Sequence, residues 1–227
     1  MFRTPNLQLL SLHVPKTGGT SFRNTLKTIY GEASVARLDV NMRGQVEIDQ
    51  QVIATGATIL HPVLHGHVKW NQWQELFQAS PRTTVITWLR DPVARVTSQY
   101  SYLVEVLERE LDEPGKGLNI LSKLMKTFPE FIRNPEVRNI QSQYFTPLIL
   151  DRFVDFVGVL EHREADLAKL AQRLSWPDHP TDFQHNKTAR LIEPTPSEID
   201  LIRACNDDDV RLYEQVLEWR AAGRYDA

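Results

Sequence analysis

Near the N-terminus, a short segment contains the residue types that bind phosphate groups. It reads Val-Pro-Lys-Thr-Gly-Gly-Thr-Ser over residues 14–21 and follows the apolar run Leu7–Val14. Adjacent glycines let the backbone turn tightly and approach an anion closely, and a helix starting after them would direct free N–H groups at that anion. Lys16 adds a positive charge. We therefore expect a phosphate-binding loop formed by Lys16, Thr17, Gly18, Gly19, Thr20 and Ser21.

The residue order in this loop differs from that of the Walker A loop of ATP-using and GTP-using proteins. A Walker A loop places its lysine after the glycines, whereas Lys16 precedes Gly18 and Gly19. The lysine should therefore reach the site from the end of the strand rather than from the helix.

A second string suited to phosphate binding reads Trp-Leu-Arg-Asp-Pro-Val-Ala-Arg-Val-Thr-Ser over residues 88–98. The β-branched, apolar run Thr83–Leu89 predicts a central parallel strand. Arg90 then lies at the end of a strand, where its guanidinium group can bind a phosphate with two hydrogen bonds. Ser98 follows about two helical turns later, and its hydroxyl group can face the same pocket if that helix packs along it.

Asp91 admits two interpretations. Followed by Pro92, it fits the N-cap of a helix, because Asp is favoured at that position and Pro at the first helical residue. It also fits a magnesium-binding carboxylate in an enzyme that uses ATP. We favour the N-cap.

Predicted strands alternate with predicted helices along the chain. Strands are expected at 7–14, 34–38, 58–64, 83–89 and 153–160, and helices after the first loop to about residue 30, at 71–77, from 92 onward, up to about 144, at 164–174 and at 197–220. This order predicts an α/β fold with a mainly parallel sheet, helices on both faces and one domain over residues 1–227. Ligands bind at the carboxyl ends of such strands, so the two strings should line one site. A mobile loop is expected from Glu108 to Gly117.

Composition limits the possible functions. The 227 residues are 41% hydrophobic with a formal net charge of −3, which argues against a general nucleic-acid binder. The single cysteine, Cys205, excludes an intrachain disulfide. No apolar stretch is long enough to span a membrane. These features favour a cytoplasmic protein without a membrane span, and they leave its oligomeric state open.

Together, the two strings resemble the sulfotransferase family that uses 3′-phosphoadenosine 5′-phosphosulfate (PAPS), and specifically its carbohydrate branch, which includes heparan sulfate and uronyl 2-O-sulfotransferases. The matching residues are Lys16 to Ser21 in the first string and Arg90, Asp91, Pro92, Arg95 and Ser98 in the second. Weaker similarities lie in residues 139–145, 156–161, 185–188 and 209–213.

The resemblance implies a P-loop-like α/β fold and the transfer of a sulfuryl group from PAPS to a hydroxyl group. The product nucleotide would be 3′-phosphoadenosine 5′-phosphate (PAP), and no metal would be required. Lys16 would contact the sulfuryl group and the oxygen that bridges it to the nucleotide. The loop from Gly18 to Ser21 would hold the 5′-phosphate, and Arg90 and Ser98 the 3′-phosphate. Residues 186–190 would close over the nucleotide.

Histidines near the end of the strand expected at 58–64 are candidates for the base that the acceptor hydroxyl needs. His65 and His67 are two residues apart, so in an extended segment they share a face. A His-Gly-His string here resembles the uronyl 2-O-sulfotransferase branch, which implies His67 as the base and His65 as its helper. A purely structural role remains open for both. A metal site of His61, His65 and His67 is less favoured, because no cysteine lies nearby. His13, inside the first strand, is expected to be buried structure.

The acceptor is less constrained by the sequence than the donor. Lys and Arg are spread along the chain without a basic channel, which favours a small or weakly charged saccharide, or another alcohol. Trp70, Trp73, Tyr100 and Tyr102 could stack on a sugar or adenine ring, although most such residues belong to the core. Two other functions stay open: an ATP-dependent kinase, and a nucleotide-binding scaffold without catalysis.

Overall fold

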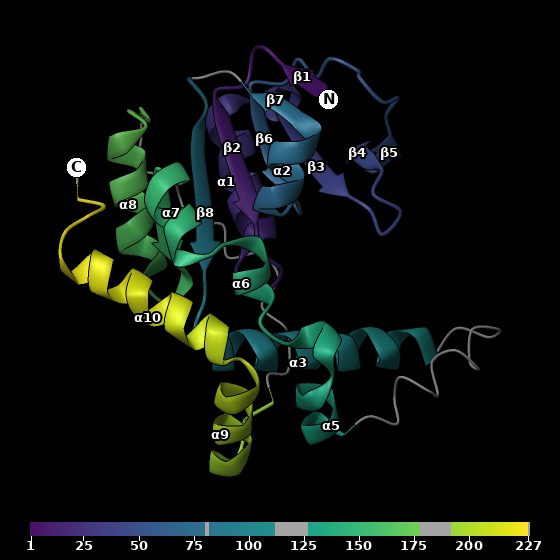
Figure 1. Ribbon diagram of the computed structural model, residues 1–227, viewed down its shortest axis with the longest axis vertical. Coiled ribbons are helices and arrows are strands. Elements are labelled where there is room, and N and C mark those ends of the chain that lie inside the picture. The colour runs from purple at the N-terminus through teal and green to yellow at the C-terminus, as the bar shows by residue number, and fades with distance from the viewer. Residues whose placement is uncertain (80–81, 112–126, 178–191, 227) are drawn as a thin grey trace.

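A seven-stranded sheet forms the centre of the molecule in the computed structural model, which describes residues 1–79, 82–111, 127–177 and 192–226 (Figure 1). The strand order is β5-β4-β3-β6-β2-β8-β9; the run from β3 to β9 is parallel, and β4 and β5 are antiparallel at one edge. A separate parallel pair joins β1 to β7. The strands are β1 (Phe2–Thr4), β2 (Leu9–His13), β3 (Val35–Val40), β4 (Val46–Ile48), β5 (Gln51–Val52), β6 (Val63–Gly66), β7 (Phe77–Ala79), β8 (Thr84–Leu89) and β9 (Phe156–Val159).

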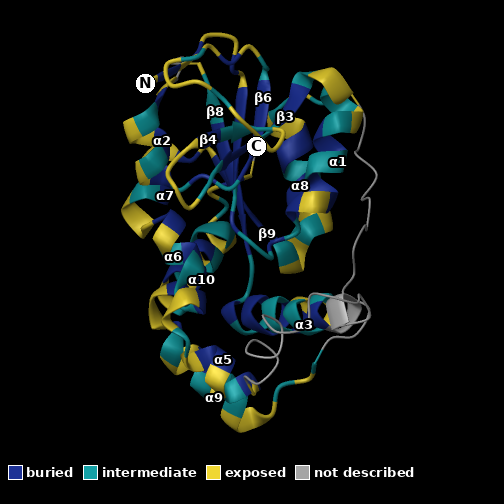
Figure 2. Cartoon of the chain, turned by 90° about the vertical axis from the view of Figure 1, so that its right-hand side faces the viewer, coloured by how far each residue is buried: buried dark blue, intermediate teal, exposed yellow. Residues whose placement is uncertain are grey.

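Helices cover both faces of this sheet, which confirms the predicted α/β fold. Figure 2 shows α1 and α8 on one face and α2 and α7 on the other, with α3 running across the end of the sheet. Beyond α3 lie α5 and α9 (Figure 1). The helices are α1 (Gly19–Tyr30), α2 (Trp70–Leu76), α3 (Pro92–Leu111), α5 (Phe128–Arg133), α6 (Ile140–Tyr144), α7 (Pro147–Phe153), α8 (Arg163–Arg173), α9 (Pro196–Cys205) and α10 (Asp207–Ala221).

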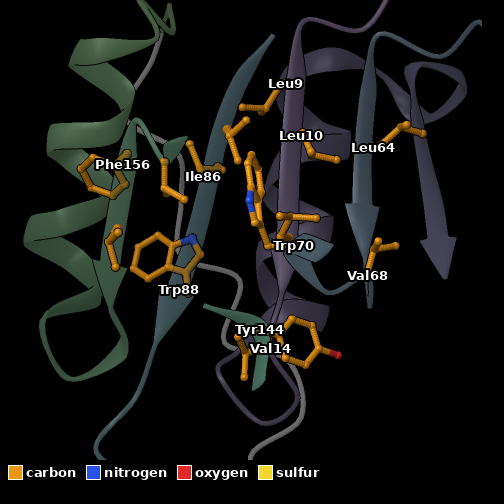
Figure 3. Packing of buried hydrophobic residues seen from close by; sticks show 14 of the residues in the cluster. Leu9, Leu10, Val14, Leu64, Val68, Trp70, Ile86, Trp88, Tyr144 and Phe156 are labelled. Carbon is orange, nitrogen blue, oxygen red and sulfur yellow. The ribbon is translucent and has the colours of Figure 1, made fainter. Parts of the chain in front are cut away.

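The central strands β2 and β8 are buried on both faces, as their apolar sequences predict. Leu9, Leu10 and Ile86 pack in the core together with Trp88 and Phe156 (Figure 3). The one buried hydroxyl of β8 has a partner, since Thr87 Oγ1 donates to the carbonyl oxygen of Leu12 at 2.7 Å. These contacts fix β2 beside β8 and bring their carboxyl ends together.

Close approach of β6 to β3 requires a glycine at position 66. A Cβ atom there would lie 1.7 Å from the carbonyl oxygen of Leu38. Gly66 therefore allows β6 to pair with β3. This packing explains why the middle residue of the His-Gly-His string is glycine.

Several predicted boundaries were wrong. The strand expected from residue 58 begins only at Val63, after Pro62, which has no backbone N–H to donate. The helix expected at 197–220 is broken at Asn206, whose side chain accepts from the amide of Asn139 and donates to Ile202. Helix α3 continues to Leu111, so the first residues of the loop expected from Glu108 are helical, and the rest of that segment lies outside the described residues. Sequence patterns did not predict the short elements β1, β4, β5, β7 and α7.

A buried ion pair joins α3 to α10. Arg95 and Asp209 are both fully buried, with 3.7 Å between Nε and Oδ2. Arg95 also donates to the carbonyl oxygen of Val137, and Asp209 accepts from the amides of Gln141 and Ser142. Burial lowers the pKa of Arg95 to about 10 and raises the pKa of Asp209, so desolvation outweighs the mutual attraction for each group. The pair therefore fixes positions, while contributing little net stability.

Breaking this pair should destabilise the fold strongly, because it would leave Asp209 charged and buried without its partner. We expect Arg95→Met to lower the free energy of unfolding by about 3–5 kcal/mol. Arg211→Met is the matched control: Arg211 pairs with Asp207 and Asp208 at the surface, and its loss should cost less than about 1 kcal/mol. Urea denaturation measures both, and equal losses in the two variants would contradict this account.

Candidate active site

The chemically suited residues gather at one edge of the sheet. Because β2, β6, β8 and β9 are parallel neighbours, the segments that follow them all leave from the same edge. These segments carry Lys16, His67, Arg90 and Glu161 in turn. The sequence prediction that the two strings meet at one edge is therefore confirmed.

The loop after β2 leads directly into the N-terminus of α1. Gly18 is the N-cap, in the left-handed region at φ 83°, and no side-chain hydrogen bond caps the helix among the described residues. Amides of the first turn have no partner inside a helix; here the first intrahelical donor is the amide of Phe22, which bonds Gly18 at 3.1 Å. With Thr20 exposed at this end, the loop offers backbone donors and the positive end of a helix dipole to an anion.

Not every hydroxyl group of the loop faces outward. Thr17 is buried, and its hydroxyl donates to the carbonyl oxygen of Val14 at 2.9 Å. Ser21 is also buried. The hydroxyl group of Thr17 therefore stabilises the loop from inside, whereas the side chain of Thr20 is exposed to solvent.

Two cations meet beside this loop. Arg90 Nη1 donates to the carbonyl oxygen of Lys16 at 3.2 Å. Burial, and next the positive charge of Arg90, lower the pKa of Lys16 to about 8, while Glu105 opposes the shift. Lys16 itself has φ 71°, a conformation that costs energy in residues other than glycine. The charge of Arg90 thus acts on the Lys16 ammonium group, and a bound anion would raise the pKa of Lys16 again.

The backbone of Arg90 is held from both sides by the side-chain amide of Gln141. The amide of Arg90 donates to Gln141 Oε1 at 2.9 Å, and Gln141 Nε2 donates to the carbonyl oxygen of Arg90 at 2.9 Å. Glu161 accepts from the amide of Asp91 and from the hydroxyl of Tyr213, and lies 3.9 Å from Arg90 Nε. The segments 139–145, 156–161 and 209–213, which carry the weaker similarities, therefore each contribute a residue that holds Arg90 directly or through Glu161.

Asp91 and Ser98 both lie on or beside α3. Asp91 Oδ1 accepts from the amide of Ala94 at 2.8 Å, as expected for an N-cap. The prediction of a cap is confirmed, and the carboxylate is already engaged by the helix. Ser98 is buried on α3, the helix that crosses the carboxyl end of the sheet (Figure 1).

Three histidine rings pack together beside the loop, with His13 in contact with the other two. The ring of His13 lies 5.2 Å from that of His65 and 4.7 Å from that of His67, measured between centroids. A Cβ at Gly19 would lie 2.1 Å from His13 Nε2, so the first residue of α1 must be glycine for the helix to start against this ring. His13 thus joins the loop after β2 to His65 in β6 and to His67 just after that strand, a role that its position inside a strand did not reveal.

His67 is held in one orientation by two hydrogen bonds. Its amide donates to Asp39 Oδ1 at 3.0 Å, and its Nδ1 lies 2.9 Å from the carbonyl oxygen of His13. A carbonyl oxygen can only accept, so Nδ1 carries the hydrogen. Burial lowers the pKa of His67, although Asp39 and the bond to His13 oppose the shift. The neutral ring therefore has its lone pair on Nε2.

His65 is more deeply placed than His67. Its side chain is buried, and its Nδ1 lies 2.9 Å from Ser11 Oγ. Burial is the largest cause that lowers the pKa of His65 to about 3. His65 is therefore a neutral ring behind His67. Among the described residues, no group of three His, Cys, Asp or Glu side chains is arranged to hold a metal ion.

The aromatic residues named from the sequence separate into core and surface. Trp70 and Trp73 are buried, and Tyr100 packs between Phe128 and Phe131. Tyr102 is 51% exposed, and Lys16 Nζ lies 3.8 Å from the centroid of its ring. Tyr102 alone of the four therefore presents its ring beside the loop.

Comparison with known proteins identifies the family. The profile described as "Sulfotransferase family" matches residues 1–214, so the chain belongs to the sulfotransferase family. The predicted family is confirmed, whereas the carbohydrate branch stays a prediction. No protein with a curated description matches the sequence.

One solved structure that the chain matches is that of the mouse sulfotransferase SULT7A1, which was determined in complex with PAP. The two sequences are 13% identical, and the TM-score is 0.42. The alignment covers 89% of this chain and 65% of the mouse chain, so this chain spans less than two thirds of that protein's length.

In the part of the chain that the structure describes, no helix has the length and apolar character to cross a membrane.

The tautomer of His67 is directly measurable. We expect the neutral form with hydrogen on Nδ1 at pH 7, and a pKa below 6.5, because burial disfavours the charged ring. Two-dimensional ¹H–¹⁵N NMR of the ring nitrogens, assigned with a His67→Gln variant, reports both. A ring with hydrogen on Nε2 at pH 7 would mean that the bond to His13 does not form.

Proposed function

We propose that this protein transfers a sulfuryl group from PAPS to a hydroxyl group of an acceptor, and that the acceptor is a carbohydrate. One observation carries the proposal: the guanidinium group of Arg90 bonds the backbone of Lys16 beside the N-terminus of α1, which has no side-chain cap. Family membership supports the reaction class, and the geometry supports an anionic, nucleotide-like donor.

The donor fits the residues of this edge. The loop of Lys16, Thr17, Gly18, Gly19, Thr20 and Ser21 would hold the 5′-phosphosulfate, with the amides of the first turn of α1 as donors. Arg90 and Ser98 would hold the 3′-phosphate. In this assignment the side chain of Thr17 supports the loop from beneath, and its backbone belongs to the phosphate cradle. No metal is required, because Lys16 and Arg90 supply the positive charge.

The proposed chemistry is an in-line displacement at sulfur. The acceptor oxygen forms a bond to sulfur while the bond from sulfur to the bridging phosphate oxygen breaks, and PAP leaves. His67 Nε2 accepts the proton of the acceptor hydroxyl. Lys16 donates to the bridging oxygen and stabilises its developing negative charge. His65 acts as helper by packing behind His13 and His67, since its buried ring does not face an acceptor.

A carbohydrate acceptor is supported by the His-Gly-His string and by one exposed aromatic ring. Tyr102 lies beside Lys16, where a sugar ring could stack on it. The kinase alternative is less well supported, because Asp91 caps α3 and Lys16 precedes the glycines. The scaffold alternative does not account for a neutral, oriented His67 at the same edge.

The role of Arg90 is tested by comparing nucleotides with and without a 3′-phosphate. Arg90→Gln should weaken PAP binding by about 10- to 100-fold, the loss expected for charge-assisted hydrogen bonds. Binding of adenosine 5′-phosphosulfate, which lacks that phosphate, should change by less than about threefold. Calorimetry measures both, with Arg211→Gln as the control. If the binding of both nucleotides is weakened equally, Arg90 does not bind the 3′-phosphate.

The role of His67 is tested by separating turnover from donor binding. His67→Asn should lower kcat by about 10²–10⁴, the usual contribution of a general base, and should change the Kd of PAP by less than about twofold. The assay follows ³⁵S transfer from PAPS to desulfated, uronate-containing oligosaccharides. Loss of PAP binding would instead assign His67 a structural role. If the unmodified protein transfers sulfate to no saccharide, the proposal of a carbohydrate acceptor is wrong.

A further inference from the structure

Strand β3 carries two charged side chains that no step of the proposed sulfuryl transfer uses. Arg37 and Asp39 are two residues apart, so both side chains leave the strand on the same face. Arg37 Nε donates to Asp39 Oδ2 at 2.6 Å, and the side chain of Asp39 is 13% exposed, compared with 36% for that of Arg37. Burying a carboxylate costs free energy even when it is paired, so the position of Asp39 needs an explanation.

The backbone of His67 is attached to β3 through both of its polar groups. Its amide donates to Asp39 Oδ1 at 3.0 Å, and its carbonyl oxygen accepts from the amide of Val40 at 3.3 Å. The regular pairing of β6 with β3 reaches only His65, which lies opposite Arg37. The carboxylate of Asp39 therefore extends the attachment beyond the end of β6 and fixes the residue that carries the proposed base.

Two opposite charges act on the ring of His67. Burial is the largest influence on the pKa of His67 and lowers it; of the two charges, that of Asp39 raises this pKa and that of Arg37 lowers it. The rings of His13 and His65 are buried, and burial lowers the pKa of each so far that both rings are uncharged at pH 7. The charge on the ring of His67 is therefore controlled from β3.

Titratable groups on other elements act on the neighbours of His67: Lys16 after β2 acts on His13, Arg23 of α1 on His65, and Tyr144 of α6 is acted on by Asp39. Burial, and next the charge of Asp39, raise the pKa of Tyr144, so its hydroxyl group is uncharged where His67 titrates. Among the described residues, Arg37 and Asp39 are thus the charged pair placed to set the basicity of His67.

We propose that Asp39 is a positioning residue for the sulfuryl transfer and that Arg37 moderates its effect. Asp39 holds the backbone of His67, and its charge stabilises the imidazolium that forms when Nε2 takes the proton of the acceptor hydroxyl. The proton stays on His67 and does not pass to Asp39. Arg37 offsets part of the negative charge, which keeps the ring neutral until the acceptor reacts. This proposal rests on the proposed role of His67 as the base.

Replacing each charge by a neutral side chain should shift the pKa of His67 in opposite directions. Asp39→Asn keeps an oxygen that can accept from the amide of His67 but removes the negative charge, so the pKa should fall. Arg37→Gln removes the positive charge, so the pKa should rise. NMR titration of the His67 ring in the protein without donor measures both, and it requires no acceptor. Shifts in the same direction, or no shift in either variant, would overturn the proposal.

A matched control and a double variant separate this electrostatic effect from a loss of structure. Glu32→Gln also removes a paired carboxylate, but Glu32 pairs with Lys27 beyond the far end of α1, so the pKa of His67 should not move. The double variant Arg37→Gln/Asp39→Asn should give a pKa between those of the two single variants. Arg37 is the more exposed partner, so Arg37→Gln tests the proposal even if Asp39→Asn does not fold.

The pH dependence of ³⁵S transfer tests the same pair in the reaction. His67 must be neutral to accept a proton, so kcat falls as the pH drops through its pKa. Asp39→Asn should move this fall to lower pH and reduce kcat at pH 7.5 by about fivefold or more, because the imidazolium loses a nearby opposite charge. Arg37→Gln should move the fall to higher pH. Both should change the Kd of PAP by less than about twofold.

The His67→Asn variant distinguishes failure of this proposal from failure of the proposed function. If His67→Asn retains full turnover, the assignment of His67 as base is wrong, and the role of Asp39 in the reaction falls with it. If His67→Asn loses turnover while Asp39→Asn leaves both kcat and its pH dependence unchanged, the base stands and the role of Asp39 alone is wrong.

Discussion

The side-chain amide of Gln141 bonds the backbone of Arg90 at both its amide and its carbonyl group, and the rest of the site depends on this contact. Gln141 is itself held by Asp209, which accepts from its backbone amide and pairs with the buried Arg95. A helix near the C-terminus thereby fixes the end of a central strand. Because these groups are buried, any movement here would leave a charge and several hydrogen-bond donors without partners, which would cost free energy.

A second constraint is the dense packing behind the phosphate loop. The ring of His13 fills the space that any side chain at Gly19 would need, and the carbonyl oxygen of His13 accepts from His67. One residue therefore sets both where α1 begins and which nitrogen of His67 can take a proton. These contacts join the loop proposed to bind the donor to the histidine proposed to accept the proton, which supports treating them as a single site.

The sequence predicted the sheet, the meeting of the two strings at one edge and the cap at Asp91, because each follows from local residue types and from the rule that parallel strands end at one edge. It did not predict Gln141, Asp209 or Glu161 as supports of Arg90, since those contacts join residues about 50 to 70 positions apart. The role of His13 was missed because a single histidine in a strand gives no pattern. The break at Asn206 depends on its distant partner Asn139, and the antiparallel edge strands β4 and β5 are too short and polar to stand out.

The central claim is that the edge carrying Lys16 and Arg90 binds a nucleotide with a 3′-phosphate and needs no metal. Calorimetric titration with PAP in the presence of EDTA, beside ATP with Mg²⁺, tests it most directly. The account predicts tight binding of PAP without metal and much weaker binding of ATP with Mg²⁺. Preference for ATP with Mg²⁺ would contradict the account and favour a kinase, and failure to bind either nucleotide would favour a scaffold.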